Sequence, residues 1–451
     1  MRKHFAAVAL LLFLVGSLYG TSTPAQPDDR MKADVLLIVA HPDDETGVSA
    51  YLAKLIDGGK RVAAVYLTRG DAGHNNMGSE RARSLGLVRE TELRRSMTAI
   101  GVENVWFLNC PDTPSQNVLR SLADWHHGAA LEDVVRIVRL TRPEVVFTWL
   151  PAFRIGENHG DHQAAGVLAT EAFDISGDPA IFPAQLAGPV AVNEMLLEGL
   201  HPWQIQKLYY FSDAADDKQF KGMGPSLPVN EVSTVRHLPY WRVAFDAFAY
   251  HLTQYRDYIQ KMQAMNEQEL NKKAESDWAQ PIQLIFGKSA VKASPTGDPF
   301  EGTSKDSIPF VRNVAESPSH PDDALAELAG PWGFYDVFGP EHSLRLPHLG
   351  VQEISIPKGS TLTIPLALRN ASGDPKTFTV SITAPAGWAT ESGAGEYSIG
   401  SHTSTAVTLR LTAPATDAGT LQEIVCHINV PGQTPTEIKL QVKLQAGGLP
   451  Q

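Results

Sequence analysis

Two short clusters of histidine and carboxylate residues have the composition of a metal-dependent hydrolytic site. The first is HPDDE at residues 41–45, and the second is NHGDH at residues 158–162. Imidazole nitrogen and carboxylate oxygen are suitable ligands for a divalent metal, and a catalytic zinc site holds three protein ligands and leaves one position for water. The two clusters together could therefore hold a metal that activates water for hydrolysis.

Both clusters follow apolar segments that are typical of strands buried on both faces. Residues 34–40 (DVLLIVA) precede the first cluster, and residues 145–149 precede the second. Ligands bind beyond the carboxyl ends of the strands in open α/β sheets, so we expect the two clusters to converge on one cleft. Further strand-like runs at residues 62–67 and 105–108 alternate with helical patterns at residues 47–55, 84–100 and 131–140. This alternation predicts an α/β fold class, a Rossmann-like layered domain with a mostly parallel sheet.

The C-terminal part of the chain has a different pattern. Apolar residues alternate with polar or small ones at residues 362–368, 407–411 and 438–444, which predicts an antiparallel β-sandwich over residues 349–446. Residues 281–348 are rich in Gly, Pro and Ser, and we interpret them as a connector packed on the catalytic domain. A second HPDD, at residues 320–323, precedes ALAEL and is expected to start a helix without binding metal.

The N-terminal residues have the pattern of a secretory signal peptide. Arg2 and Lys3 precede an apolar run over residues 5–18, and small residues follow up to Ala25. A transmembrane anchor is the alternative, but the run is shorter than the ~20 residues that a span needs. We therefore expect a signal peptide over residues 1–25, a secreted or periplasmic mature protein, and no stable membrane span.

Composition narrows the choice of partner. The chain has 451 residues, 43% of them hydrophobic, with 38 Lys+Arg against 50 Asp+Glu and a formal net charge of −12. This composition fits a protein of several globular domains. The acidic balance without basic runs argues against nucleic acid as a partner. The two cysteines, Cys110 and Cys426, fall in different predicted domains, so we expect unpaired thiols.

The motifs together resemble the LmbE/PIG-L family of zinc-dependent N-acetylglucosaminyl deacetylases. The matching segments are AHPDDE at residues 40–45, TRGDAG at residues 68–73, the Arg89-x-x-Glu92 helix leading to Asp112, and HGDH at residues 159–162. A looser match is AYHLTQ, which contains His251 and Gln254. The resemblance implies a deacetylase domain over residues 33–280. The C-terminal segment resembles the Ig-like NEW3-type modules of exported carbohydrate-active enzymes, in which Trp388 is expected to pack in the core.

The resemblance also implies roles for individual residues. The metal ligands would be His41, Asp44 and His162, and the metal would be Zn²⁺, although Fe²⁺ or Mn²⁺ suits the same ligands. Asp43 would act as general base, His159 would stabilise the oxyanion or protonate the leaving amine, and Asp161 would orient an imidazole. Substrate contacts are expected from a polar loop at residues 69–78 and the following helix: Arg69, Asp71, His74 and Arg89.

The implied reaction is removal of an acetyl or similar acyl group from an N-acetylated amino sugar or glycoconjugate. One alternative is a metal-dependent amidase acting on a non-sugar or thiol-conjugated amide. Another is a glycan-binding protein whose deacetylase-like domain is inactive. The sequence contains all three implied metal ligands, which favours the enzyme, and it leaves the sugar and the oligomeric state open.

Overall fold

The computed structural model describes ten parts of the chain. They are residues 27–114, 117–152, 159–186, 199–212, 220–310, 324–330, 333–334, 338, 352–416 and 421–445. The predicted signal peptide and the second HPDD at residues 320–323 lie outside these ranges. Within them, no helix has both the length and the apolar character needed to cross a membrane.

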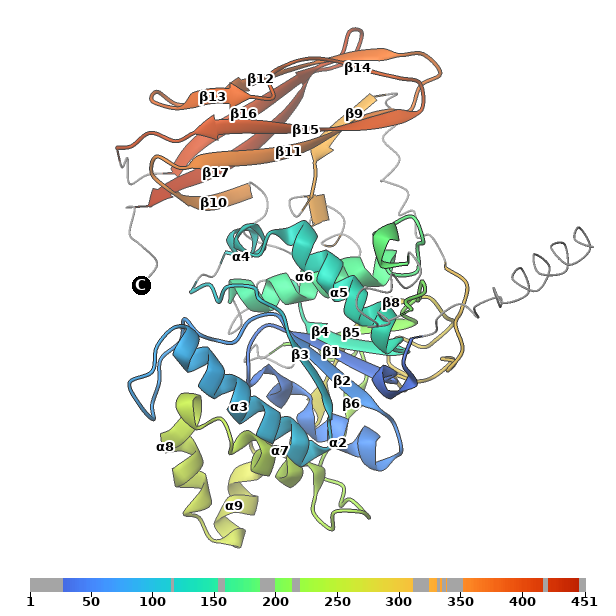
Figure 1. Ribbon diagram of the computed structural model, residues 1–451, viewed down its shortest axis with the longest axis vertical. Helices are drawn as coiled ribbons and strands as arrows, with labels where there is room; N and C mark the ends of the chain where they lie inside the picture. The colour runs from blue at the N-terminus through green and yellow to red at the C-terminus, as the bar shows by residue number, and fades with distance from the viewer. Residues whose placement is uncertain are drawn as a thin grey trace, which may run out of the picture.

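A six-stranded sheet forms the centre of the first domain, with the order β3-β2-β1-β4-β5-β8 (Figure 1). Its strands are β1 (Val35–Val39), β2 (Val62–Tyr66), β3 (Asn104–Phe107), β4 (Val145–Trp149), β5 (Lys207–Phe211) and β8 (Ile285–Ser289). All neighbours pair in parallel except β8, which runs antiparallel to β5. The predicted α/β domain with a mostly parallel sheet is confirmed.

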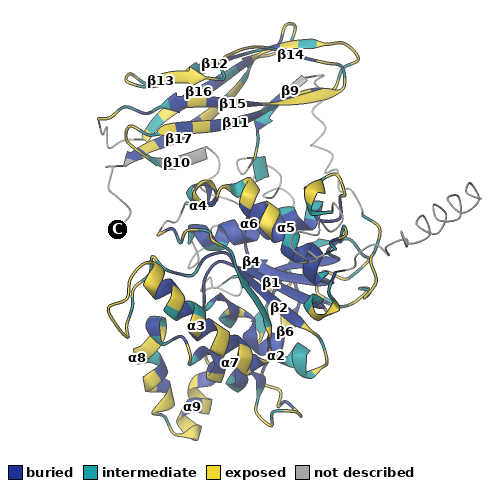
Figure 2. Ribbon diagram, in the orientation of Figure 1, coloured by how far each residue is buried: buried dark blue, intermediate teal, exposed yellow. Residues whose placement is uncertain are grey.

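Helices cover both faces of this sheet, which explains why β1, β2, β4 and β5 are apolar and fully buried (Figure 2). One layer contains α2 (Ser49–Asp57), α3 (Arg83–Ile100) and α7 (Tyr240–Phe248), and the other contains α4 (Val118–Asp124), α5 (His127–Thr141) and α6 (Gly160–Ile175). Short elements complete the domain: η1 (Asp29–Met31), η2 (Asp44–Gly47), η3 (Pro183–Gln185), β6 (Ser226–Leu227) and β7 (Ile282–Gln283).

Residues 240–263 form two helices separated by a short break. The chain leaves helical geometry after α7 and starts again in α8 (Leu252–Gln263), which is followed by α9 (Glu267–Ala274). His251 lies at this break, and its fully buried side chain reaches Glu45 beside the first cluster. The break therefore brings a residue of the helical layer to the edge of the sheet.

A glycine lets α6 approach β4 closely. A Cβ atom on Gly166 would lie 2.3 Å from the carbonyl oxygen of Trp149, closer than carbon and oxygen can approach without a shift of the helix. Gly166 therefore holds α6, with HGDH at its N-terminal end, against the carboxyl end of β4.

The described residues 281–310 pack on the α/β domain, and part of this segment joins the central sheet. β8 lies in the segment that was assigned to the connector. Further along, the Thr303 hydroxyl donates to Glu144 Oε2 at 2.7 Å, and the Ser304 amide donates to Gln206 Oε1 at 2.8 Å. The first domain thus extends beyond the expected boundary at residue 280.

Two further sheets form the C-terminal β domain, with the orders β10-β17-β16-β12-β14 and β13-β15-β11-β9. Their strands are β9 (Ala324–Leu328), β10 (Gln352–Pro357), β11 (Thr361–Asn370), β12 (Lys376–Thr383), β13 (Ala389–Ser392), β14 (Gly395–Ile399), β15 (Thr403–Thr412), β16 (Leu421–Asn429) and β17 (Thr436–Gln445). Neighbours are antiparallel apart from β10 and β17, which pair in parallel.

The helix start expected at ALAEL is wrong. These residues form β9, which pairs antiparallel with β11 and buries Ala326 and Leu328 at alternate positions. A pattern of five residues is too short to distinguish a strand from a helix. The segment forms a strand because it pairs with the edge of β11 that β15 leaves open. The β domain therefore includes residues before 349. Trp388, expected in the core, is only half-buried and packs against it, and Cys110 and Cys426 are free thiols.

Candidate metal centre

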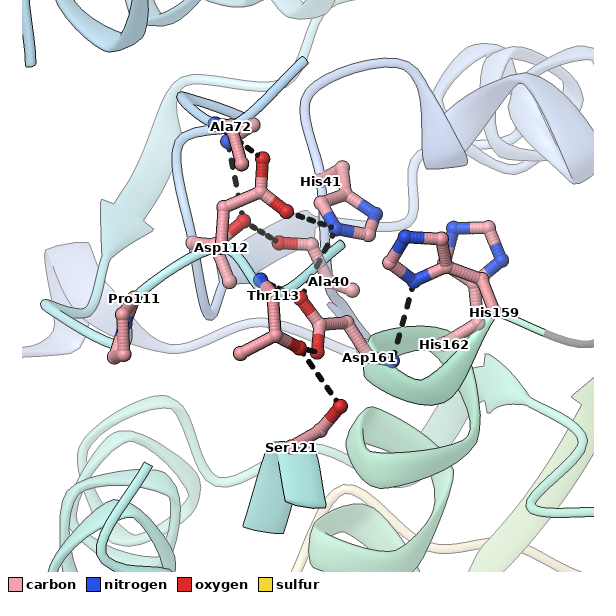
Figure 3. Close-up of polar contacts among 12 residues, drawn as sticks. Ala40, His41, Ala72, Pro111, Asp112, Thr113, Ser121, His159, Asp161 and His162 are labelled. Carbon is pink, nitrogen blue, oxygen red and sulfur yellow. Dashed lines mark hydrogen bonds and ion pairs between the residues drawn. The ribbon is translucent and has the colours of Figure 1, made fainter. Parts of the chain in front are cut away.

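The two histidine-carboxylate clusters meet where the strand order of the central sheet reverses. β1 lies between β2 and β4, so the chain leaves β1 and β4 at the same edge and in opposite directions, which creates a crevice. The ring centroid of His41, after β1, lies 4.8 Å from that of His159 and 5.0 Å from that of His162, both from the start of α6 (Figure 3). The predicted convergence is confirmed.

Asp44 uses its two carboxylate oxygens in different ways. Oδ2 accepts hydrogen bonds from the amides of Ala40 and His41, both at 2.9 Å, and from Trp149 Nε1 at 2.7 Å. Oδ1 lies 3.1 Å from His162 Nε2 and 3.8 Å from His41 Nδ1. Burial would raise the pKa of Asp44, but the two imidazoles lower it well below its usual range. One oxygen is thus anchored, while the other is an anionic donor facing two imidazole nitrogens.

The opposite nitrogen of His41 is held by carboxylates. Nε2 donates to Asp112 Oδ1 at 3.1 Å and lies 3.4 Å from Asp161 Oδ2 (Figure 3). Burial would raise the pKa of Asp112, but the hydrogen bond from His41 and its charge lower it to about 2. These bonds hold a proton on Nε2 and turn Nδ1 toward Asp44, where a bound metal would take the place of a second ring proton, the arrangement that carboxylates give to metal-binding histidines.

Asp161 lies behind His41 and supports it. Its carboxylate accepts hydrogen bonds from the backbone amide of Thr113, at 2.9 Å, and from the Thr113 hydroxyl, which also contacts Ser121 Oγ at 2.9 Å (Figure 3). Asp161 is fully buried, so it has no direct access to solvent. This placement fits the implied orienting role and gives the residue no contact with substrate.

The donor set fits a divalent metal. Two groups of three donors in the described ranges come within 4.8 Å of one another: His41 with His159 and His162, and His41 with Asp112 and Asp161. Asp44 Oδ1 adds an anionic donor beside His41 and His162. A mixture of imidazole nitrogen and carboxylate oxygen suits Zn²⁺, Fe²⁺ or Mn²⁺. Because Asp112 and Asp161 lie against Nε2 of His41, a metal at this histidine would meet Nδ1, with Oδ1 of Asp44, His159 and His162 as the neighbouring donors.

Asp43 occupies a strained backbone conformation next to these donors. Its φ of 119° lies in the left-handed region, which costs energy for a residue with a Cβ atom. Its backbone amide donates to Glu45 Oε2 at 3.1 Å, which helps to hold this conformation. Burial and the negative charge of Asp44 raise the pKa of Asp43 to about 6. Asp43 is therefore a carboxylate suited to accept a proton near neutral pH.

His159 is placed as a neutral hydrogen-bond donor. It caps the N-terminus of α6, where its Nδ1 accepts a hydrogen bond from the Asp161 amide at 3.2 Å. The neutral ring therefore carries its proton on Nε2. Burial, together with the charges of His41 and His162, lowers the pKa of His159 and favours this neutral form. The implied oxyanion-stabilising role is compatible with this tautomer.

The start of α8 holds the HPDDE loop at two points. His251 Nε2 contacts Glu45 Oε1 at 2.6 Å, and Gln254 Nε2 donates to the carbonyl of Pro42 at 2.6 Å. Tyr255 lines the same cavity as Asp43, whose negative charge raises the pKa of the phenol. The loose AYHLTQ match indicated His251 and Gln254, whereas no motif indicated Tyr255.

Glu45 connects this contact to the core, and its loss should destabilise the fold. Its two oxygens bond to His251, Ser96 Oγ at 2.9 Å, the Tyr66 hydroxyl at 3.0 Å and the Asp43 amide. We expect Glu45→Ala to lower the free energy of unfolding by ~3–5 kcal/mol, because it leaves buried polar groups unpaired.

Urea denaturation measures this loss, and Glu267→Ala provides a matched control. Glu267 forms an exposed ion pair with Arg242, for which a change of at most ~1 kcal/mol is expected. Equal, small effects of the two substitutions would contradict a structural role for Glu45.

Asp112 offers a test of how His41 is held. Asn at this position can keep only one of two bonds, that to His41 Nε2 or that from the Ala72 amide at 2.7 Å. We expect Asp112→Asn to weaken metal affinity ~10–100-fold, the usual cost of losing a residue that orients a ligand. Titration against a chromophoric chelator measures the affinity. Complete loss of binding would instead make Asp112 a ligand.

The donors open into a cavity of about 640 Å³, which contains two of the four predicted substrate contacts. His74 and Arg89 line it. The Arg89 guanidinium donates to the carbonyls of Gly70 at 2.6 Å and His74 at 2.9 Å, so it holds the loop over the cavity. Arg89 and Glu92 are both buried, and Glu92 accepts hydrogen bonds from Thr253.

The other two predicted substrate contacts lie elsewhere. Arg69 and Asp71 line a separate depression of about 350 Å³. Arg69 Nε donates to Glu90 Oε2 at 2.9 Å, and its Nη1 donates to the carbonyl of Leu108 at 3.1 Å. These bonds turn the guanidinium toward α3 and the end of β3, so Arg69, like Asp71, lies outside the cavity that the metal donors line.

Some residues of the site were missed from the sequence. Trp149 stacks on His162 with a centroid distance of 4.2 Å and an interplanar angle of 6°, and it also anchors Asp44. In the sequence Trp149 is the last residue of a predicted buried strand. Only its position at the end of the strand that precedes the second cluster could have indicated a place in the site. The aromatic residues of α8 that line the cavity carry no sequence signal of this kind.

Comparison with known proteins agrees with this geometry. Residues 36–173 match the model of the PIG-L family, described as GlcNAc-PI de-N-acetylase. The chain is 31% identical over 192 residues to the 1D-myo-inositol 2-acetamido-2-deoxy-alpha-D-glucopyranoside deacetylase of Geodermatophilus obscurus, which covers 39% of this chain and 60% of that protein. The enzyme of the same description from Thermobifida fusca is 28% identical over 255 residues, with 49% and 82% covered. These matches support a PIG-L/LmbE-type deacetylase domain.

The extent of the matches is limited. The alignments span 60% and 58% of the relatives from Geodermatophilus obscurus and Streptomyces scabiei. Among solved structures, N,N'-diacetylchitobiose deacetylase from Pyrococcus horikoshii is 21% identical, with a TM-score of 0.41 and coverage of 60% of this chain and 87% of that chain. The β domain lies outside the segment that the family model matches.

Proposed function

We propose that the protein is a metal-dependent N-deacetylase that acts on an N-acetylated amino sugar or glycoconjugate. The observation that carries the proposal is that the two carboxylate oxygens of Asp44 have different partners. Three donors hold one of its oxygens, and the other oxygen faces the imidazoles of His41 and His162. The relatives named above, which are deacetylases of an acetamido sugar, support the substrate class.

The residues of the site have separate tasks in amide hydrolysis. His41, Asp44 and His162 would hold the metal, and a bound divalent metal supplies Lewis-acid activation of water and of a carbonyl. Asp43, with its raised pKa, would accept the proton of the attacking water. His159, neutral with its proton on Nε2, would donate a hydrogen bond to the developing oxyanion, and the proton that Asp43 takes from water would pass to the leaving amine.

We further propose that the enzyme acts outside the cytoplasm, in keeping with the signal-peptide pattern of residues 1–25. An exported hydrolase with an appended β domain would meet sugars of the cell surface or the surrounding medium. N-terminal sequencing of the protein from its host tests export. We expect the exported protein to begin after residue 25, and cytoplasmic protein that still begins at Met1 would contradict the proposal.

The experiment for the activity uses the full chain in three states. Protein stripped with a chelator is compared with protein reloaded with Zn²⁺, Fe²⁺ or Mn²⁺, and acetate release is measured from N-acetylglucosamine, from N,N'-diacetylchitobiose and from a simple N-acetylated amine. We expect release only after reloading and only from the sugars. Release by metal-free protein would contradict metal dependence, and preference for the simple amide would contradict the substrate class.

A further inference from the structure

The cavity continues from the metal centre onto four aromatic side chains, which we call the aromatic wall: Phe248, Tyr255, Tyr258 and Trp278. Phe248 is buried, and its ring centroid lies 4.8 Å from Tyr255, 5.1 Å from Trp278 and 6.0 Å from Tyr258. The wall is therefore a packed unit organised on one ring. It is continuous with the metal centre because the same cavity is lined by Asp43, Asp44 and His162.

Hydrogen bonds hold the outer part of the wall in place. Trp278 Nε1 donates to the Tyr258 hydroxyl at 2.9 Å, and that hydroxyl donates to Asp277 Oδ2 at 3.1 Å. The Trp278 ring also packs edge-on against Phe245 at 5.4 Å. The aromatic faces are thus fixed before any ligand binds, with a carboxylate at their rim.

The chemistry of the aromatic wall favours a sugar ring over an acyl chain as the ligand. An acyl chain would need an enclosed apolar pocket, whereas this wall carries phenol groups and has Asp277 and Gln254 beside it. The side chain of Asp277 is 47% exposed, and Tyr255 is 40% exposed. Flat apolar faces with polar groups at their edges match a sugar ring, which has C–H faces and equatorial hydroxyls. The cavity volume of about 640 Å³ lies within the ~300–1,000 Å³ range of pockets that bury drug-sized ligands, which leaves room beside the reacting sugar.

We propose that the aromatic wall is a subsite for a second pyranose ring, joined to the N-acetylated sugar that is deacetylated. The proposal rests on the proposed function, and it names the substrate as a disaccharide or longer glycan. Trp278 provides the stacking face and Asp277 accepts hydrogen bonds from hydroxyls. All residues of the wall lie beyond residues 36–173, so this specificity comes from a part of the chain that the family model does not match.

The test compares kcat and KM for N-acetylglucosamine and N,N'-diacetylchitobiose in the wild type and in Trp278→Ala. We expect the substitution to raise KM for the disaccharide about tenfold, the size expected for loss of one aromatic contact, with kcat unchanged. KM for the monosaccharide should not change. Trp278→Tyr should restore most of the loss, because it keeps an aromatic face and is the more conservative change for folding.

A matched control is available in Tyr250. It is 40% exposed, like Tyr255, but it lines a different surface depression with Arg94 and Thr98. Tyr250→Ala should change neither substrate's kinetics. Equal effects of Trp278→Ala on both sugars would overturn the proposal. A larger effect on N-butanoylglucosamine than on the disaccharide would also overturn it, because the wall would then bind the acyl chain.

Failure of the proposed function can be told apart from failure of the subsite. If no sugar is deacetylated by metal-loaded protein, calorimetric titration with N,N'-diacetylchitobiose still measures binding to the cavity. Binding to the wild type that weakens about tenfold in Trp278→Ala would support the subsite alone. Binding that is unchanged by this substitution would overturn it.

Discussion

Asp44→Asn is expected to abolish metal binding and activity while preserving the fold. The Asn carbonyl oxygen can take the place of Oδ2 and accept the bonds from the Ala40 and His41 amides and from Trp149. The amide nitrogen then replaces Oδ1 and presents N–H groups to the imidazoles of His41 and His162, where a metal needs a lone pair. We expect bound metal to fall from about one ion per chain to a small fraction, because a catalytic site of this type has only three protein ligands.

Elemental analysis of dialysed protein measures the bound metal, and acetate release measures the activity. We expect the activity to fall by ~10³-fold or more, the size of loss seen when a group that stabilises the transition state is removed. Thermal unfolding of the two metal-free proteins should coincide within a few degrees, because a ~1 kcal/mol change shifts Tm only that far in a large domain. Wild-type metal content in Asp44→Asn would contradict the assignment and would favour the donor group of His41, Asp112 and Asp161.

Asp44→Ala is the matched comparison for this result. It also removes the ligand, but it leaves the backbone amides of Ala40 and His41 and the Trp149 indole without their acceptor. Each buried donor that loses its partner costs ~1–3 kcal/mol. Metal-free Asp44→Ala should therefore unfold at clearly lower urea concentration than metal-free Asp44→Asn. Equal stability of the two would contradict the anchoring role of Oδ2.

The centre of the fold and of the site could be predicted because the information is local in the sequence. An unbroken apolar run such as residues 34–40 is compatible with few environments other than a strand covered on both faces. Its carboxyl end is then the place where a ligand binds, so the residues that follow it become candidates. The same reasoning applied to β4 placed His159 and His162 at the same edge without knowledge of the strand order.

The remainder of the site depends on contacts between distant parts of the chain. Asp112 follows β3, and its importance comes from the 3.1 Å contact with His41, 71 residues away. Tyr255 and Trp278 line the cavity because α8 and the segment after α9 fold back onto it. Arg69 was expected in the cavity, but Glu90 and the carbonyl of Leu108 turn it away. Motifs indicate residue types, whereas the direction of a side chain is decided by partners that no local pattern contains.

Asp43→Asn is expected to lower kcat by ~10²–10⁴-fold, the usual contribution of a general base, while metal content stays at the wild-type level. Asp43 lines the cavity beside the metal ligands, and its pKa is raised to about 6 by burial and by the charge of Asp44, so it can accept a proton that an amide cannot. Asn is the appropriate replacement because, like Asp, it tolerates positive φ, and the backbone at this position has φ of 119°. The substitution therefore removes the charge without changing the backbone.

Comparison with Asp43→Ala separates the proton transfer from the conformation of the loop. Ala lacks the side-chain oxygen, and the left-handed backbone conformation costs it ~1–2 kcal/mol. The Asp43→Ala variant should therefore lose stability as well as kcat. If Asp43 acts as general base, Asp43→Asn should keep wild-type metal content, wild-type KM and wild-type urea stability, with the loss confined to kcat. Loss of metal from Asp43→Asn would make Asp43 a ligand, and an unchanged kcat would assign the proton transfer to another group. His159 would then be the group to examine, since it lines the same cavity and its lowered pKa keeps it neutral.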